Sequence, residues 1–315
     1  MAKQTTKRVG ENSLKTKIFI YSLIIWPLLH FLIFWVYINF DTVLLTFERY
    51  SFQSNKYVFI GLENYKDLIK WVFMQNPNNM MDLAIKNSIS IVIFIIFVMQ
   101  PVSLVFGYAM FKKVPLNSAF KVIFFLPNII SSVVLVLVFQ LMFDPDLGPI
   151  QKILEFIGLG GLKPELGWFG SAETAWNMVL IECLWAGIGY DMIIFLSGYN
   201  RIPTEIVESA TLDGAGFFRE FAQIAIPLIA PTISTMIIMA SGSALTFFMN
   251  PLLLTNGGPD GASGTIMMIL LNNVKSGSGG LTMAATIGIG FSIVFLPIIF
   301  AIRKLVEKLL PSVEF

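Results

Sequence analysis

Residues 201–227, RIPTEIVESATLDGAGFFREFAQIAIP, form a charged segment between two strongly apolar ones. The charged side chains are those of Arg201, Glu205, Glu208, Asp213, Arg219 and Glu220. Because ionised side chains are costly to place in hydrocarbon, we expect this segment to lie in water between two membrane spans.

The same segment predicts two short helices separated by glycines. Pro203 suits the first turn of a helix, where no backbone N–H is required. Gly214 and Gly216 end this helix, and a second one is predicted from Phe217 to Ile224, before Pro227 opens the next apolar run. Two helices folded at glycines make a compact unit that is suited to fit a partner.

A spaced pattern in this segment resembles the EAA loop of ABC importer permeases. The match is Glu208-Ser209-Ala210, three residues, Gly214, nine residues, Ile224, one residue and Ile226-Pro227. Ser209 and Ile226 depart from the family's Ala and Leu, and Leu212-Asp213-Gly214-Ala215 is similar to the form in sugar-importer permeases. The resemblance implies contact with an ATPase subunit through Glu208, Ser209, Ala210, Asp213, Gly214, Ala215, Ile224 and Pro227. For Asp213, capping of the second helix is an equal alternative.

Composition places the whole chain in a membrane. The 315 residues are 56% hydrophobic and 13% charged, with a mean hydropathy of +0.76. A soluble domain carries about a quarter charged residues, so the sequence indicates a polytopic helical membrane protein. The net charge of +1 and the absence of a basic stripe give no reason to expect nucleic acid.

Six apolar runs are long enough to span a bilayer. They are residues 18–40, 88–111, 122–143, 175–197, 228–248 and 281–302. The predicted fold is an all-α polytopic membrane protein, with six transmembrane helices and a cytoplasmic two-helix coupling loop. We also expect a short interfacial helix over residues 150–157.

The distribution of basic residues predicts the orientation in the membrane. The tails and the second and fourth loops hold 13 of the 21 Lys and Arg residues. The positive-inside rule therefore places both termini and residues 201–227 in the cytoplasm, in a multi-pass protein of the cell membrane. The expected parts are a cytoplasmic tail at 1–17, a first span with an external segment at 18–82, a five-helix core at 83–304 and a cytoplasmic tail at 305–315.

Nucleotide-binding, catalytic and metal-binding patterns are not found in the sequence. Residues 275–280 are glycine-rich but lack the Gly-Lys-Ser/Thr ending that holds phosphates, so ATP and Mg²⁺ are expected in another subunit. His30 lies in the first span without a second ligand nearby in the sequence. No cofactor is expected in this chain, and we expect it to be a non-catalytic subunit.

Two carboxylates lie inside a predicted span, where ionisable groups are functional candidates. Nine residues, or about 900° of helix rotation, separate Glu182 from Asp191, so the two side chains are expected on opposite faces. This spacing argues against an acid–base pair. It leaves open an ion or proton site, as in a secondary transporter.

Candidate pore residues come from the chemistry of sugar binding, which uses aromatic faces together with amide and hydroxyl groups. Tyr190 resembles, by its position before the loop, a pore tyrosine of maltose-type permeases. Ser243, Phe247 and Asn250 recur at i, i+4 and i+7 and are expected on one face of the fifth helix. The predicted pore set is Tyr190, Trp185, Glu182, Ser243, Phe247 and Asn250. Packing alone is an equal explanation for each of them.

The resemblance extends over about residues 51–314, because Phe59–Tyr65 and Leu254–Pro259 are also similar to phrases of sugar permeases. It implies a second homologous permease, two cytoplasmic ATPase subunits, an external solute-binding protein and a carbohydrate substrate moved by alternating access. Alternatives are a permease for another solute such as glycerol phosphate, or a secondary transporter.

Overall fold

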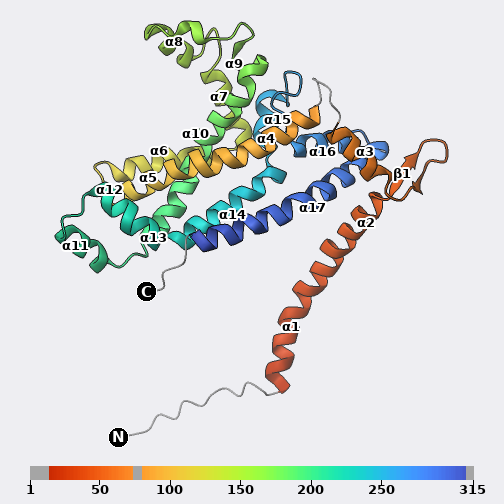
Figure 1. The fold of residues 1–315 in the computed structure, drawn as a ribbon, viewed down its shortest axis with the longest axis horizontal. Helices are drawn as coiled ribbons and strands as arrows, with labels where there is room; N and C mark the ends of the chain where they lie inside the picture. Colours follow the sequence, from red (N-terminus) through yellow and green to blue (C-terminus); the bar gives the residue numbers. More distant parts are fainter. Residues whose placement is uncertain (1–13, 74–79, 310–315) are drawn as a thin grey trace.

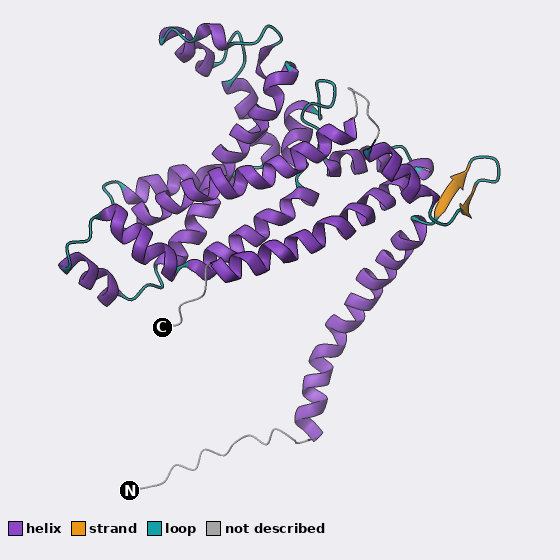
Figure 2. Ribbon diagram, in the orientation of Figure 1, coloured by secondary structure: helices purple, strands orange, loops and turns teal. Residues whose placement is uncertain are grey.

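The computed structural model of the protein describes residues 14–73 and 80–309. Helices make up most of this part of the chain (Figure 2). Four helices are long and apolar enough to cross a membrane, or up to six if each of two bent helix pairs forms one span. This agrees with the predicted polytopic all-α class.

The first apolar helix projects away from the bundle and meets it at its C-terminal end, which lies against α17 (Ser278–Leu309) (Figure 1). It consists of α1 (Leu14–Phe31), the π-helical segment η1 (Leu32–Tyr37) and α2 (Ile38–Leu45). None of the residues in its most apolar window is buried. Its apolar side chains therefore face lipid or another subunit. The helix begins inside the stretch 1–17 that was expected as a tail, and residues 1–13 of that tail lie outside the described residues.

A hairpin that the all-α prediction missed follows this helix. Strand β1 (Glu48–Ser51) pairs antiparallel with β2 (Lys56–Phe59), with Glu48 opposite Phe59. Asn64, on α3 (Glu63–Val72), donates through Nδ2 to the carbonyl oxygens of Thr46 and Glu48. This buried amide ties the hairpin to α3.

The second long helix is made of α4 (Met80–Phe94), the π-helical segment η2 (Ile95–Met99) and α5 (Gln100–Phe111). Pro101 has no N–H for the helical ladder, and the widened turn just before it accommodates the proline ring. Gln100 lies beside the proline and donates through Nε2 to the Met236 carbonyl at 2.8 Å. The Gln100 side chain therefore links α5 to the helix that carries Met236, beside the irregular turn.

The third predicted span, 122–143, is not a single helix. It divides into α6 (Asn117–Ile129) and α7 (Ser132–Met142), which meet at 109°. Pro127 removes a hydrogen bond from the last turn of α6, and Ile130 and Ser131 are extended. Ser131 is then the N-cap residue of α7, although its side chain makes no capping hydrogen bond.

The outer segment carries α8 (Pro149–Phe156), the 3₁₀ turn η3 (Gly160–Leu162) and α9 (Gly167–Gly170) before the long α10 (Ala172–Tyr199). The helix expected over 150–157 is confirmed as α8. Figure 1 places α8 and α9 beyond the bundle, at the end of α10 remote from α11.

The remaining helices complete the bundle. They are α11 (Thr204–Leu212), α12 (Phe217–Glu220), η4 (Phe221–Ala225), α13 (Ile226–Leu228), α14 (Ala230–Thr246), α15 (Met249–Thr255), α16 (Ile266–Lys275) and α17 (Ser278–Leu309). Helix α17 therefore continues into the stretch 305–315 that was expected as a tail. Figure 1 places α11 and α12 at one end of the bundle and α3, α16 and the hairpin at the other.

Glycines allow α10 to approach its neighbours closely. A Cβ at Gly189 would overlap the carbonyl of Phe124 on α6, and one at Gly107 of α5 would lie 3.1 Å from the Met192 carbonyl oxygen. Small residues that let helix backbones meet are a common device of membrane bundles. The contact of α10 with α5 and α6 depends on them.

Gly189→Ala should destabilise the protein by about 1–3 kcal/mol, because the added methyl group forces two backbones apart. The midpoint of thermal unfolding in detergent measures this effect. Gly242→Ala is the matched control, since a Cβ there meets nothing within 4 Å. Equal midpoints for the two variants would contradict the account of this contact.

Candidate coupling loop and transmembrane polar site

The charged segment folds as predicted at its glycine turn. Helix α11 ends at Leu212, and Gly214 follows with φ +73°, a left-handed conformation that glycine adopts without strain. The Ala215 N–H donates to the Ala210 carbonyl at 3.0 Å across the turn, which is the closing bond of a Schellman motif. A Cβ at Gly214 would meet nothing within this chain. The glycine is therefore required by its φ angle and not by crowding.

The expected cap by Asp213 is wrong. Asp213 is the C-terminal cap residue of α11, whereas the N-cap of α12 is Gly216 and carries no side-chain cap bond. Asp213 and Glu208 are both exposed. The Asp213 carboxylate is thus free to face a partner.

The second helix is longer than predicted. It runs from Phe217 to Leu228 through the π-helical segment η4, and Pro227 lies inside it. The widened turn just before Pro227 accommodates a ring that a regular α-turn would reject. The chain then bends by 75° at Ile229 into α14. Pro231, and not Pro227, stands at the start of the next apolar helix.

The outer face of the loop combines acidic and apolar groups. Leu212 and Phe218 are 88% and 77% exposed, and Leu212 lies one turn from Glu208 and Ser209 on α11. By contrast, Ala210 is buried, and Ala215 and Ile224 are half-buried. Of the matched positions, Glu208, Ser209, Asp213 and Gly214 are therefore exposed, as is Pro227, whereas Ala210, Ala215 and Ile224 pack inward.

Glu220 is the one loop charge whose position was wrongly predicted, because it does not lie in water. Its side chain is 4% exposed, and both carboxylate oxygens accept from Lys112 Nζ at 3.0 Å. Tyr108, fully buried one turn before Lys112, contacts Phe217 and Phe221 with ring centroids 4.9 and 5.1 Å away. Lys112 and Glu220 are 108 residues apart, so no short sequence pattern could have predicted this contact.

The two intramembrane carboxylates are both buried and lie in different surroundings. Glu182 accepts a hydrogen bond from Asn250 Nδ2 on α15. Asp191 is 5% exposed, and its Oδ2 atom has no hydrogen-bond partner among the described residues. The expected separation of the two groups agrees with these unlike environments. Glu182 reaches a neighbouring helix of its own chain and not an open surface.

The predicted polar face of the fifth helix is not continuous. Helix α14 ends at Thr246, Phe247 is extended, and Asn250 belongs to α15. Thr265 Oγ1 donates to the freed Phe247 carbonyl at 2.8 Å, which satisfies the break. Ser243 and Phe247 therefore do not share one helical face with Asn250. The i, i+4, i+7 argument assumed a helix that the sequence interrupts.

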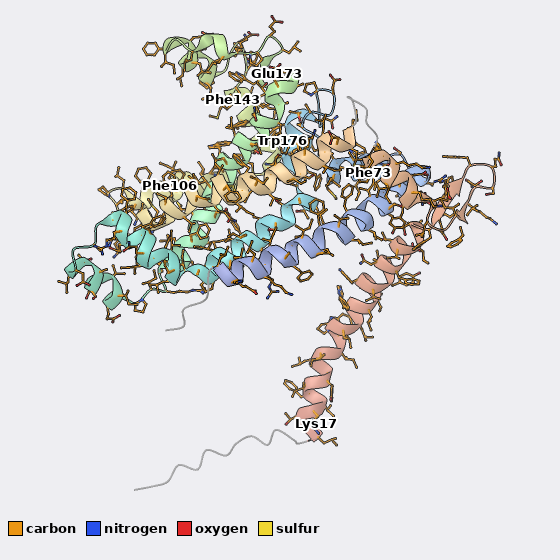
Figure 3. All side chains as sticks on the ribbon, in the orientation of Figure 1. Lys17, Phe73, Phe106, Phe143, Glu173 and Trp176 are labelled. Carbon is orange, nitrogen blue, oxygen red and sulfur yellow. The ribbon has the colours of Figure 1, made fainter. Side chains whose placement is uncertain are left out.

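The aromatic candidates also separate. Trp185 stacks on Phe139 of α7 at 5.7 Å, so it is a packing residue within this chain, whereas Tyr190 is 49% exposed. Trp176, nearer the outer end of α10, donates through Nε1 to Ser90 Oγ at 2.9 Å (Figure 3).

Within residues 14–73 and 80–309, no three His, Cys, Asp or Glu side chains gather as a metal site.

The helices describe a polytopic membrane protein, and comparison with known families gives its class. Residues 99–311 match the family described as binding-protein-dependent transport system inner membrane component, and the chain belongs to this family. It is 33% identical over 246 residues to the probable ABC transporter permease protein YurN of Bacillus subtilis, covering 78% of this chain and 81% of that protein.

Two further comparisons agree with this assignment. The chain is 28% identical over 254 residues to the multiple sugar-binding transport system permease protein MsmF of Streptococcus mutans, covering 80% of this chain and 83% of that protein. A chain of a bacterial alginate ABC transporter, solved in complex with an alginate pentasaccharide-bound periplasmic protein, has the same fold. It superposes with a TM-score of 0.78 at 20% identity, covering 95% of this chain and 97% of that one.

Asn250→Leu should destabilise the protein by about 1–3 kcal/mol, because the buried Glu182 carboxylate loses its hydrogen-bond donor. Thermal unfolding of the purified protein measures the loss. Asn177→Leu is the control, since Asn177 is exposed on the same helix as Glu182 and bonds only to the nearby Glu173 carbonyl. An Asn250→Leu variant as stable as the control would show that the hydrogen bond contributes nothing.

Proposed function

We propose that the chain is the transmembrane permease subunit of an ATP-driven ABC importer and forms half of the pathway for a sugar or oligosaccharide by alternating access. The observation that carries the proposal is the loop at 201–227, with its exposed Glu208 and its glycine turn at Gly214, inside the family match. The names of the relatives support the substrate class, since MsmF belongs to a sugar-binding system.

The partners follow from the family and the exposed surfaces. A second homologous permease supplies the other half of the pathway and covers apolar surface that this chain leaves exposed, such as α1. Two cytoplasmic ATPase subunits bind ATP and Mg²⁺, and this chain holds no cofactor. An external solute-binding protein delivers the carbohydrate, as supported by the alginate transporter solved with its periplasmic protein.

The proposed topology has six spans with both termini in the cytoplasm. The two bent pairs, α6 with α7 and α12–α13 with α14, each supply one span in this scheme. The Lys and Arg asymmetry puts the loop at 201–227 on the cytoplasmic side, where soluble ATPase subunits can reach it.

The outer face of the loop suits a cleft in an ATPase subunit. Leu212 and Phe218 supply apolar area, and Glu208 supplies a charge for a basic group. An apolar centre with a charged partner at its edge is the usual composition of a specific interface. Asp213 and Ser209 lie on the same exposed surface and extend the polar edge.

Tyr190 remains a candidate pore residue, because its side chain is 49% exposed and can contact a partner subunit or a cavity. An exposed tyrosine on a transmembrane helix offers a ring face and a hydroxyl to a sugar. The other candidates support the fold around Tyr190. Contacts of Trp185, Glu182 and Asn250 hold α7, α10 and α15 together. Ser243 and Phe247 lie near the end of α14.

Glu208→Lys and Gly214→Asp should each give protein that inserts normally but loses the ATPase subunit or its coupling. Reversal of an interface charge costs about 2–5 kcal/mol when a buried partner is left unpaired, and aspartate at φ +73° strains the turn. Co-purification of the ATPase subunit and uptake of labelled sugar measure the effect, with membrane abundance determined in parallel.

Gly216→Ala is the matched control, because its φ of −72° suits alanine and a Cβ there meets nothing within 4 Å. Normal uptake together with normal ATPase retention in Glu208→Lys and Gly214→Asp would exclude this loop as the docking site.

A further inference from the structure

The underside of the loop holds a buried ion pair that its docking face does not use. Glu220 lies on α12 and Lys112 at the end of α5, and both oxygens of the carboxylate accept from the ammonium at 3.0 Å. The Glu220 side chain is 4% exposed and that of Lys112 is 28% exposed. Most other ion pairs of the described residues join half-exposed or exposed groups, such as Arg303 with Glu307 on α17.

The geometry of this pair fits its position at two helix ends. Lys112 is the C-terminal cap residue of α5, where a cation interacts favourably with the helix dipole. Glu220 is in the first turn of α12, where an anion is favoured for the same reason. Each charge therefore stabilises the end of its own helix and pairs with the other helix.

Aromatic contacts surround the pair and join a third helix to it. Tyr108, on α5, contacts Phe217 and Phe221 of the loop and also Tyr199 at the end of α10, with ring centroids 5.4 Å apart. Apolar contacts are non-directional and permit sliding. The ion pair has a fixed geometry and sets the register of α12 on α5.

We propose that the Lys112–Glu220 ion pair is the positioning contact that makes the coupling loop move together with α5 and α10, so that movement at the ATPase reaches the membrane pathway. This inference rests on the proposed function and goes beyond docking, because neither residue belongs to the outer face of the loop. Lys112 and Glu220 act through α5 and α12 and touch neither ATP nor substrate.

The test uses the complete transporter, reconstituted in vesicles with its solute-binding protein. The binding protein is loaded from a mixture of malto-, cello- and alginate oligosaccharides. ATP hydrolysis is measured with and without this protein, and the stimulation ratio reports coupling across the membrane. Retention of the ATPase subunit is measured in the same preparations.

Three variants are compared: Glu220→Gln, the neutral double variant Lys112→Met with Glu220→Met, and the exchange Lys112→Glu with Glu220→Lys. Replacement of a whole buried pair by apolar side chains usually preserves folding. We expect the first two variants to keep the ATPase subunit and basal hydrolysis. Their stimulation ratio should fall at least about fivefold, which is the lower end of the usual range for coupling between two sites. The exchange regains the ion pair but sets each charge against the dipole of its own helix, so it should restore part of the ratio that Glu220→Gln loses. The control removes an exposed pair, by Arg303→Met with Glu307→Met, and should leave the ratio unchanged.

Wild-type stimulation in the neutral double variant would overturn the inference. Failure of the exchange to restore coupling, or loss of the neutral double variant from the membrane, would also overturn it, because the residues would then act singly or only in folding. If the unmodified transporter retains no ATPase subunit or is not stimulated by the loaded binding protein, the proposed function fails instead.

Discussion

Hydrocarbon offers no partner for backbone N–H and C=O groups, and this constraint shapes the whole chain. Regular helices satisfy those groups internally, so each irregular turn has to find its bond elsewhere. The structure shows how this is done at Phe247, whose backbone carbonyl accepts from Thr265 Oγ1 at 2.8 Å. The break after α14 is therefore also a link between helices, because Thr265 is the N-cap residue of α16.

Two of the irregular turns have the same construction. A π-helical segment ends just before Pro101 and another just before Pro227. A widened turn admits the proline ring without ending the helix, and it also leaves a point of easier bending. One segment lies within the second long helix, and the other leads from α12 toward α14. Both lie on the path from the loop into the bundle.

The sequence could predict much of this fold because its signals are local. Apolar runs, flanking charges and the glycine turn at Gly214 each reflect a few neighbouring residues, and α8 and the two-helix loop were predicted on that basis. The bend between α6 and α7 was missed because the apolar run 122–143 was predicted as one span, whereas Pro127 weakens the end of α6 inside it. The break at Phe247 carries no proline or glycine of its own and depends on Thr265, a distant residue.

The candidate site shows the same division. Glu208 and Gly214 were chosen from the resemblance to the EAA loop, and both are exposed, as a docking role requires. Glu220 was assigned to water because a charge in a polar loop is usually solvated, yet Lys112, 108 residues away in sequence, buries it. The hydrogen bond between Glu182 and Asn250 was likewise not predicted from the sequence. It joins α10 to α15, which is separated from α14 by the break at Phe247. Contacts between residues far apart in the chain depend on how the helices pack. No short pattern in a single sequence predicts that packing.

The central claim is that the loop at 201–227 docks on a separate ATPase subunit in the cytoplasm. A photo-crosslinking amino acid at Leu212, which is 88% exposed on α11, tests it most directly in intact cells that express the whole transporter. The account predicts a crosslinked product containing a subunit with a nucleotide-binding sequence, and none from the same amino acid at Phe156 on α8. Crosslinking of that subunit from Phe156 in place of Leu212, or from neither position, would contradict the account.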